Sequence, residues 1–190
     1  MLTEFVRDHA FTIAWFGLMA LVWFGWAQED PPRGRRAWIG AGSVLGLVLA
    51  GVFGFAVFRL WGQGTALAGR YHWFGILTGI EVLAAGVGCV LLWRWGRTRW
   101  MAWWVALVVA VHFLPLAWLL DDLSLALLGL IQVGGLLVLR SRLARDTAPT
   151  SRVVGPFMGL TLLVFAAVSV VLYLARHGTT LTGGVMPSPG

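Results

Sequence analysis

The sequence predicts an all-α, polytopic integral membrane protein, a bundle of six transmembrane helices with both termini on the non-cytoplasmic side. Of its 190 residues, 59% are hydrophobic and only 12% are charged, and the mean hydropathy is +0.83. A soluble domain carries roughly twice that share of charge, and one folded core could not hide so much apolar surface from water. The apolar residues also form six continuous runs, each near the ~20 residues that a helix needs to cross the hydrocarbon core.

The six runs set the domain organisation. We expect membrane spans at residues 9–27, 37–58, 71–93, 101–120, 123–139 and 153–175. Helices are expected because backbone polar groups in lipid must be satisfied within their own segment. The connections are too short to form a soluble domain, so residues 1–177 are expected to make a single transmembrane domain. The tail, residues 178–190, is rich in Gly, Thr and Pro and is expected to be disordered.

The arginines predict the orientation of the bundle. All 14 basic residues are Arg, and four of them lie on one side, at Arg7, Arg59, Arg70 and Arg176. The other ten occupy the connections between spans one and two, three and four, and five and six: Arg33, Arg35, Arg36, Arg94, Arg97, Arg99, Arg140, Arg142, Arg145 and Arg152. The positive-inside rule places these connections in the cytoplasm and both termini outside it. The abundance of Gly, Ala, Arg and Trp without Lys suggests a bacterial cytoplasmic membrane.

The predicted partners follow from how charge and small residues are distributed. The net charge of +6 falls in short arginine clusters between apolar runs, so we expect contact with membrane lipid and not with nucleic acid. In the second span, Gly42, Gly46, Ala50 and Gly54 recur every four residues. Such spacing lets helix backbones approach closely. We interpret it as packing inside one bundle, and the alternative is a homo-oligomer that forms through these four residues.

Three polar side chains are predicted to lie at one depth near the middle of the membrane. At 1.5 Å per residue, Glu81 lies about 15 Å, His112 about 12 Å and Gln132 about 14 Å below the outer ends of their spans. Thr78 lies one turn outward of Glu81 on the same helix face. A charged carboxylate at this depth must be protonated, paired or hydrated, and intramembrane ionisable residues are usually functional. These residues are therefore the candidate ligand or proton site.

Three functions are compatible with this site. The leading hypothesis is a carrier or channel for a small solute or ion, with an outward-facing site and proton coupling through Glu81 and His112. In that case Gln132 and Thr78 would orient the ligand. The first alternative is a membrane-embedded enzyme that acts on a lipid or quinone-like substrate, with His112 as general base. The second is a non-catalytic accessory or sensor subunit. A purely structural role, in which the polar residues lock three helices together, is the simpler interpretation.

An outer rim of polar residues is predicted above this site. It comprises Arg70, Tyr71 and His72 before or at the start of the third span and Asp121 in the tight turn after the fourth. Arginines at a helix end usually extend to the membrane interface. The next residue, Asp122, precedes Leu123 and is expected to cap the following helix.

Metal and cofactor chemistry receives little support from the sequence. His72, His112 and Asp121 are the weak metal candidates, but no HExxH or other recognised ligand spacing is present. Exposure at the membrane interface is the simpler interpretation of His9, His72 and His177. There is no Walker loop, GxSxG elbow or CxxCH haem motif, so no cofactor is indicated and an enzyme is not the leading expectation.

Overall fold

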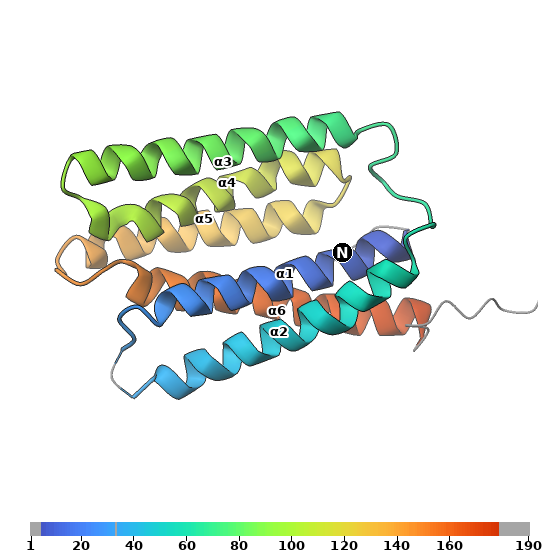
Figure 1. The fold of residues 1–190 in the computed structure, drawn as a ribbon, viewed down its shortest axis with the longest axis horizontal. Coiled ribbons are helices and arrows are strands. Elements are labelled where there is room, and N and C mark those ends of the chain that lie inside the picture. Colours follow the sequence, from blue (N-terminus) through green and yellow to red (C-terminus); the bar gives the residue numbers. More distant parts are fainter. Residues whose placement is uncertain (1–4, 33, 179–190) are drawn as a thin grey trace, which may run out of the picture.

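The computed structural model describes residues 5–32 and 34–178, which form a helical bundle (Figure 1). Its elements are α1 (Val6–Ala27), α2 (Arg36–Arg59), α3 (Tyr71–Arg94), the 3₁₀ helix η1 (Thr98–Trp100), α4 (Met101–Leu119), α5 (Leu123–Leu143) and α6 (Ser151–His177). Six of these helices are long and apolar enough to cross a membrane, which confirms the predicted six apolar helices; their insertion into a membrane stays a prediction. The predicted disorder concerns residues 178–190, of which residues 179–190 lie outside the described residues. The orientation in the membrane stays a prediction.

Most helices extend beyond the predicted apolar runs because a helix does not stop where the hydrocarbon does. The clearest case is α5, which was expected to end at residue 139 and continues to Leu143. Its last turn carries Arg140 and Arg142. Cationic side chains at this position interact favourably with the negative end of the helix dipole. At the other end of α5, the carboxylate of Asp122 accepts a hydrogen bond from the backbone N–H of Ser124 at 2.9 Å, which confirms the predicted cap.

The helices pack as two groups of three. In Figure 1, α3, α4 and α5 lie above α1, α6 and α2, and α6 also contacts α4 and α5. Phe16 of α1 joins the groups, since its ring meets Phe113 of α4 and Phe165 of α6 edge to face at 5.6 Å and 5.2 Å. Helix α3 packs on α4 at the edge of the bundle, and Gly88 is its one buried residue in the part described. The bundle therefore presents α3 and one face of α4 to its surroundings.

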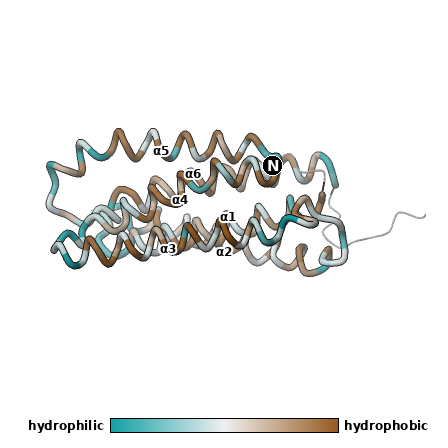
Figure 2. The backbone as a smooth tube through the Cα atoms, turned by 90° about the horizontal axis from the view of Figure 1, so that it is seen from above, coloured by the Kyte–Doolittle hydropathy of each residue, from teal (hydrophilic) through white to brown (hydrophobic). Residues whose placement is uncertain are grey.

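The two ends of the bundle differ in what they carry. The connections α1–α2, α3–α4 and α5–α6 lie together at the left in Figure 1, and we call this the arginine-rich end. The start of α1 and the last turn of α6 lie at the opposite end, which we call the terminal end. Figure 2 shows the hydrophilic residues gathered towards both ends, with apolar residues along the helices between them. This banding is what a bilayer requires of a protein that spans it.

The small-residue stripe of α2 packs against α1 within the bundle. A Cβ atom on Gly46 would lie 2.6 Å from the carbonyl oxygen of Gly17, and one on Gly42 would lie 2.7 Å from the ring of Phe24. The two backbones therefore approach too closely for any side chain at Gly46. By contrast, a Cβ on Gly54 would meet nothing within 4 Å. The packing interpretation accounts for Gly42 and Gly46, and a homo-oligomer stays a prediction.

One carboxylate fastens the connection between α2 and α3. Asp8 of α1 accepts hydrogen bonds from the backbone N–H of Ala66 at 2.7 Å and the hydroxyl of Thr65 at 3.1 Å. We expect Asp8→Ala to cost about 1–2 kcal/mol, because the partly buried amide loses its partner. The change should also speed amide hydrogen exchange at residues 65–67. Asp30→Ala is the control, since Asp30 lies in another connection and pairs with Arg152 at 3.7 Å. Equal rates of amide hydrogen exchange at residues 65–67 in the two variants would contradict the role of Asp8 in holding this connection.

Candidate functional site

The structure brings Glu81 of α3 and His112 of α4 together. The Nδ1 atom of His112 lies 3.3 Å from Oε2 of Glu81, and the two side chains are 10% and 21% exposed. The contact lacks the alignment of a hydrogen bond, so the imidazole nitrogen has no hydrogen-bond partner among the described residues. Two polar residues for which the sequence predicts similar depth therefore face each other across the α3–α4 interface. They are in contact but are not joined by a hydrogen bond.

The pair lies in a groove between α3 and α4 with a volume of about 320 Å³. Apart from this pair, its lining is mostly apolar. The lining residues are Leu77, Ile80, Glu81, Ala84, Trp104, Leu107, Val108, Val111, His112 and Pro115. The indole N–H of Trp104 donates to the carbonyl of Ala84 at 3.0 Å and joins the two helices at one end of the groove. Pro115 has no N–H, so the carbonyl of Val111 lacks its helical donor beside His112.

The groove opens sideways. Ile80 and Val111, which border it, are 59% and 46% exposed on the outer surface of the bundle. Both lie near the middle of their helices, where a membrane would place acyl chains and not water. The sequence had suggested a site that faces the outer solution. The direction from which a ligand would enter stays a prediction, and the groove itself borders the outer surface of the bundle near mid-helix.

Gln132 and Thr78 are placed differently from this pair. Gln132 is fully buried in α5, and its amide N–H donates to the hydroxyl of Thr161 in α6 at 2.9 Å. It therefore links α5 to α6 and does not line the groove. Thr78 is half-buried one turn from Glu81 and is not among the groove residues either. Of the four predicted residues, the structure brings together Glu81 and His112.

The predicted outer rim forms two separate contacts at the terminal end. Arg70 pairs with Asp121 at 3.2 Å and also donates to the carbonyl of Leu119 at 3.3 Å. Tyr71 accepts a hydrogen bond from Arg7 of α1 at 3.1 Å. His72 is exposed. Both side chains of the Arg70–Asp121 pair are accessible to solvent, so the pair contributes little to stability. It lies where the α3–α4 interface reaches the terminal end of the bundle.

A buried polar cluster at the terminal end was not predicted. His9 is fully buried, with its Nε2 atom 3.0 Å from the carbonyl oxygen of Ser169. Its ring lies 5.4 Å from that of Tyr173 and 5.9 Å from that of His177. The expectation that His9 is exposed at the interface was wrong, because α1 buries its positions 9, 13, 16 and 20 against its neighbours. That helical spacing was the available signal.

The metal candidates do not assemble into a site. His72 is exposed at the start of α3, His112 lies in the groove and Asp121 lies in the α4–α5 turn. Within the described ranges, no three side chains of His, Cys, Asp or Glu are grouped to hold a metal ion. Comparison with known proteins finds no match to a family model, a curated protein or a solved structure. Function is therefore argued from the site itself.

Proposed function

We propose that this protein is a proton-coupled carrier for lipophilic cations, with Glu81 as the group that binds either a proton or the cation. The observation that carries the proposal is the contact between Glu81 and His112 inside a largely apolar groove at the side of the bundle. In a bilayer, a groove at this position would face the acyl chains. His112 serves as the neighbour that shares the proton. The proposal retains the proton coupling expected from the sequence and adds a route of entry from the side.

The electrostatics of the groove favour exchange of one positive charge for another. A lone carboxylate in an apolar environment is costly unless it is protonated or paired. With one proton shared between Glu81 and His112, 3.3 Å apart, the pair has no net charge. A lipophilic cation that enters the groove supplies the same neutralisation, so that proton can leave. Binding of cation and proton is then mutually exclusive, which is the basis of coupled exchange.

The lining of the groove suits a cation with an apolar body. Leu77, Leu107 and Val108 supply apolar contact, and the ring of Trp104 offers an aromatic face of the kind that attracts cations. The undonated carbonyl of Val111 adds a polar acceptor next to His112. Lateral access from the bilayer favours a carrier over an aqueous channel, because the ligand would reach the groove from the lipid and not through a water-filled pore along the bundle axis.

A membrane-embedded enzyme is the second candidate, and the lateral opening favours it as well. A lipid or quinone-like substrate would enter by the same route, with His112 as general base and Glu81 holding its ring. Chemistry distinguishes the two functions. A carrier releases its ligand unchanged, whereas an enzyme converts it, which mass spectrometry of the extracted ligand detects.

The test uses tetraphenylphosphonium as the probe and the purified protein in nanodiscs of zwitterionic lipid. We expect saturable binding that weakens up to tenfold for each unit of decreasing pH, with up to one proton released per cation bound. Glu81→Gln should abolish both effects, and His112→Gln should retain binding but shift its pH dependence. Asp30→Asn is the matched control and should bind normally. Undiminished binding to folded Glu81→Gln would refute the proposal.

A further inference from the structure

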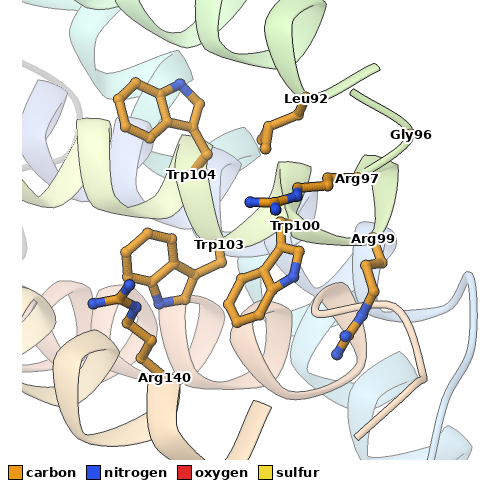
Figure 3. Close-up of a pocket in the computed structure, with 8 residues that line it drawn as sticks. All are labelled: Leu92, Gly96, Arg97, Arg99, Trp100, Trp103, Trp104 and Arg140. Atoms are coloured by element: carbon orange, nitrogen blue, oxygen red, sulfur yellow. The ribbon is translucent and has the colours of Figure 1, made fainter. Parts of the chain in front are cut away.

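A second pocket lies at the arginine-rich end, between the ends of α3 and α5 and the start of α4 (Figure 3). Its volume is about 430 Å³. We call it the arginine–tryptophan pocket, and it is lined by Leu92, Gly96, Arg97, Arg99, Trp100, Trp103, Trp104 and Arg140. Three cationic side chains therefore share one concavity with three indole rings, and none of its lining residues is acidic.

The arginines of this pocket differ in how well they are satisfied. Arg99 donates to the carbonyl of Leu143 at 2.7 Å and lies over the ring of Trp100 at 5.2 Å, yet its buried Nε atom has no hydrogen-bond partner among the described residues. Arg140 lies over the ring of Trp103 at 5.9 Å. In the part of the chain that the structure describes, neither Arg97 nor Arg140 has an acidic partner within 4 Å.

The acid in the neighbouring connection, Asp146, does not pair with Arg97 or Arg140. Asp146, in the α5–α6 connection, accepts a hydrogen bond from the Ala148 amide at 3.0 Å, and this bond holds the pKa of its carboxyl below the usual range. Its charge acts on Arg152 and Arg99. Arg97 and Arg140 are left as two unneutralised guanidinium groups that line one pocket. Such groups bind phosphate through paired N–H donors.

The tryptophans form a fixed apolar surface beside these charges. The indole N–H of Trp103 donates to the carbonyl of Leu136 at 3.1 Å, and that of Trp104 donates to Ala84 at 3.0 Å. Because both N–H groups are occupied, the rings are held in place and offer apolar contact. Trp104 also lines the groove that holds Glu81 and His112, so apolar surface continues from the pocket towards the middle of the membrane.

We propose that the arginine–tryptophan pocket binds the phosphate of an anionic phospholipid from the predicted cytoplasmic leaflet. The phosphate lies between Arg97 and Arg140, and the glycerol and upper acyl chain rest on Trp100 and Trp104. A lipid fits better than a free anion because the charges occur at the predicted headgroup level beside apolar surface. The pocket shares Trp104 with the groove of Glu81 and His112 but has its own arginines, and the inference does not depend on the proposed function.

The experiment measures retention of phosphatidylglycerol by native mass spectrometry of the purified full chain, with phosphatidylcholine as the reference lipid. We expect phosphatidylglycerol to be preferred and Arg97→Gln/Arg140→Gln to weaken its retention at least tenfold. Arg94→Gln/Arg142→Gln removes the same charge from exposed positions outside the pocket and should change retention less than twofold. Arg97→Lys/Arg140→Lys should give an intermediate loss, because lysine keeps the charge without the paired donors.

Two outcomes would overturn the inference. Equal weakening in the two glutamine double variants would mean that phosphatidylglycerol responds to overall charge and not to this pocket. Displacement of the lipid by millimolar inorganic phosphate would mean that the pocket is a site for a free anion. Circular dichroism of each variant confirms folding, and the Arg97→Lys/Arg140→Lys variant provides a second comparison if the glutamine variant of the pocket is less stable.

Discussion

The Gly46→Leu substitution is expected to lower the free energy of unfolding by about 3 kcal/mol, at the upper end of the usual cost of overpacking. Position 46 has no room for a side chain, since a Cβ there would lie 2.6 Å from the carbonyl oxygen of Gly17 and 3.0 Å from the backbone nitrogen of Leu21. Backbone atoms cannot rotate away as a flexible side chain can. Helices α1 and α2 must therefore separate, which removes van der Waals contact along their whole interface.

Gly51→Leu is the matched control for this prediction. It lies in the same helix, and a Cβ there would meet nothing within 4 Å. Both substitutions gain the same helix propensity relative to glycine, so the difference between them isolates the close approach. Unfolding in mixed micelles with sodium dodecyl sulfate, followed by tryptophan fluorescence, gives both free energies. Similar stabilities for the two variants would mean that α1 and α2 do not meet at Gly17 and Gly46.

The sequence predicts the helices well because their signal is local. A run of about 20 apolar residues needs a helix in lipid, whatever its neighbours are. Which helices contact each other is harder to predict, because the surfaces of apolar helices resemble one another in sequence. The pairing of α1 with both α2 and α6 is an example, since α6 is far away in the chain. Small residues gave the most useful hint, and Gly46 indeed packs at a close backbone contact.

The contact between Glu81 and His112 agrees with the common level predicted for these two residues, but the direction of each side chain could not be predicted. The rise per residue placed Glu81, His112 and Gln132 at one level, and that level is shared by residues on every side of a bundle. Glu81 and His112 turn towards each other, whereas Gln132 turns towards Thr161. The rotation of each helix about its axis is set by packing against its neighbours, which spacing along one chain does not reveal. The lateral opening of the groove has the same origin.

Substitutions of Tyr173 distinguish the contribution of packing from that of hydrogen bonding in the buried cluster at the terminal end. It is fully buried, and its ring meets those of His9 and Phe53, each at 5.4 Å, and that of His177 at 5.1 Å. Its hydroxyl has no hydrogen-bond partner among the described residues. We therefore expect Tyr173→Ala to cost about 4 kcal/mol through the cavity it leaves.

The Tyr173→Phe substitution is the sharper half of this prediction, because it keeps the ring and removes only the hydroxyl. An unpaired buried hydroxyl is a penalty in the folded state, so this variant should be as stable as the wild type or gain up to about 1 kcal/mol. Unfolding in mixed micelles compares the two variants directly. A loss of stability in Tyr173→Phe would mean that the hydroxyl has a partner in the membrane, such as a water molecule shared with the Nδ1 atom of His9, which is buried and unpartnered in the described residues. The cluster would then be a hydrated polar site and not a packed aromatic core.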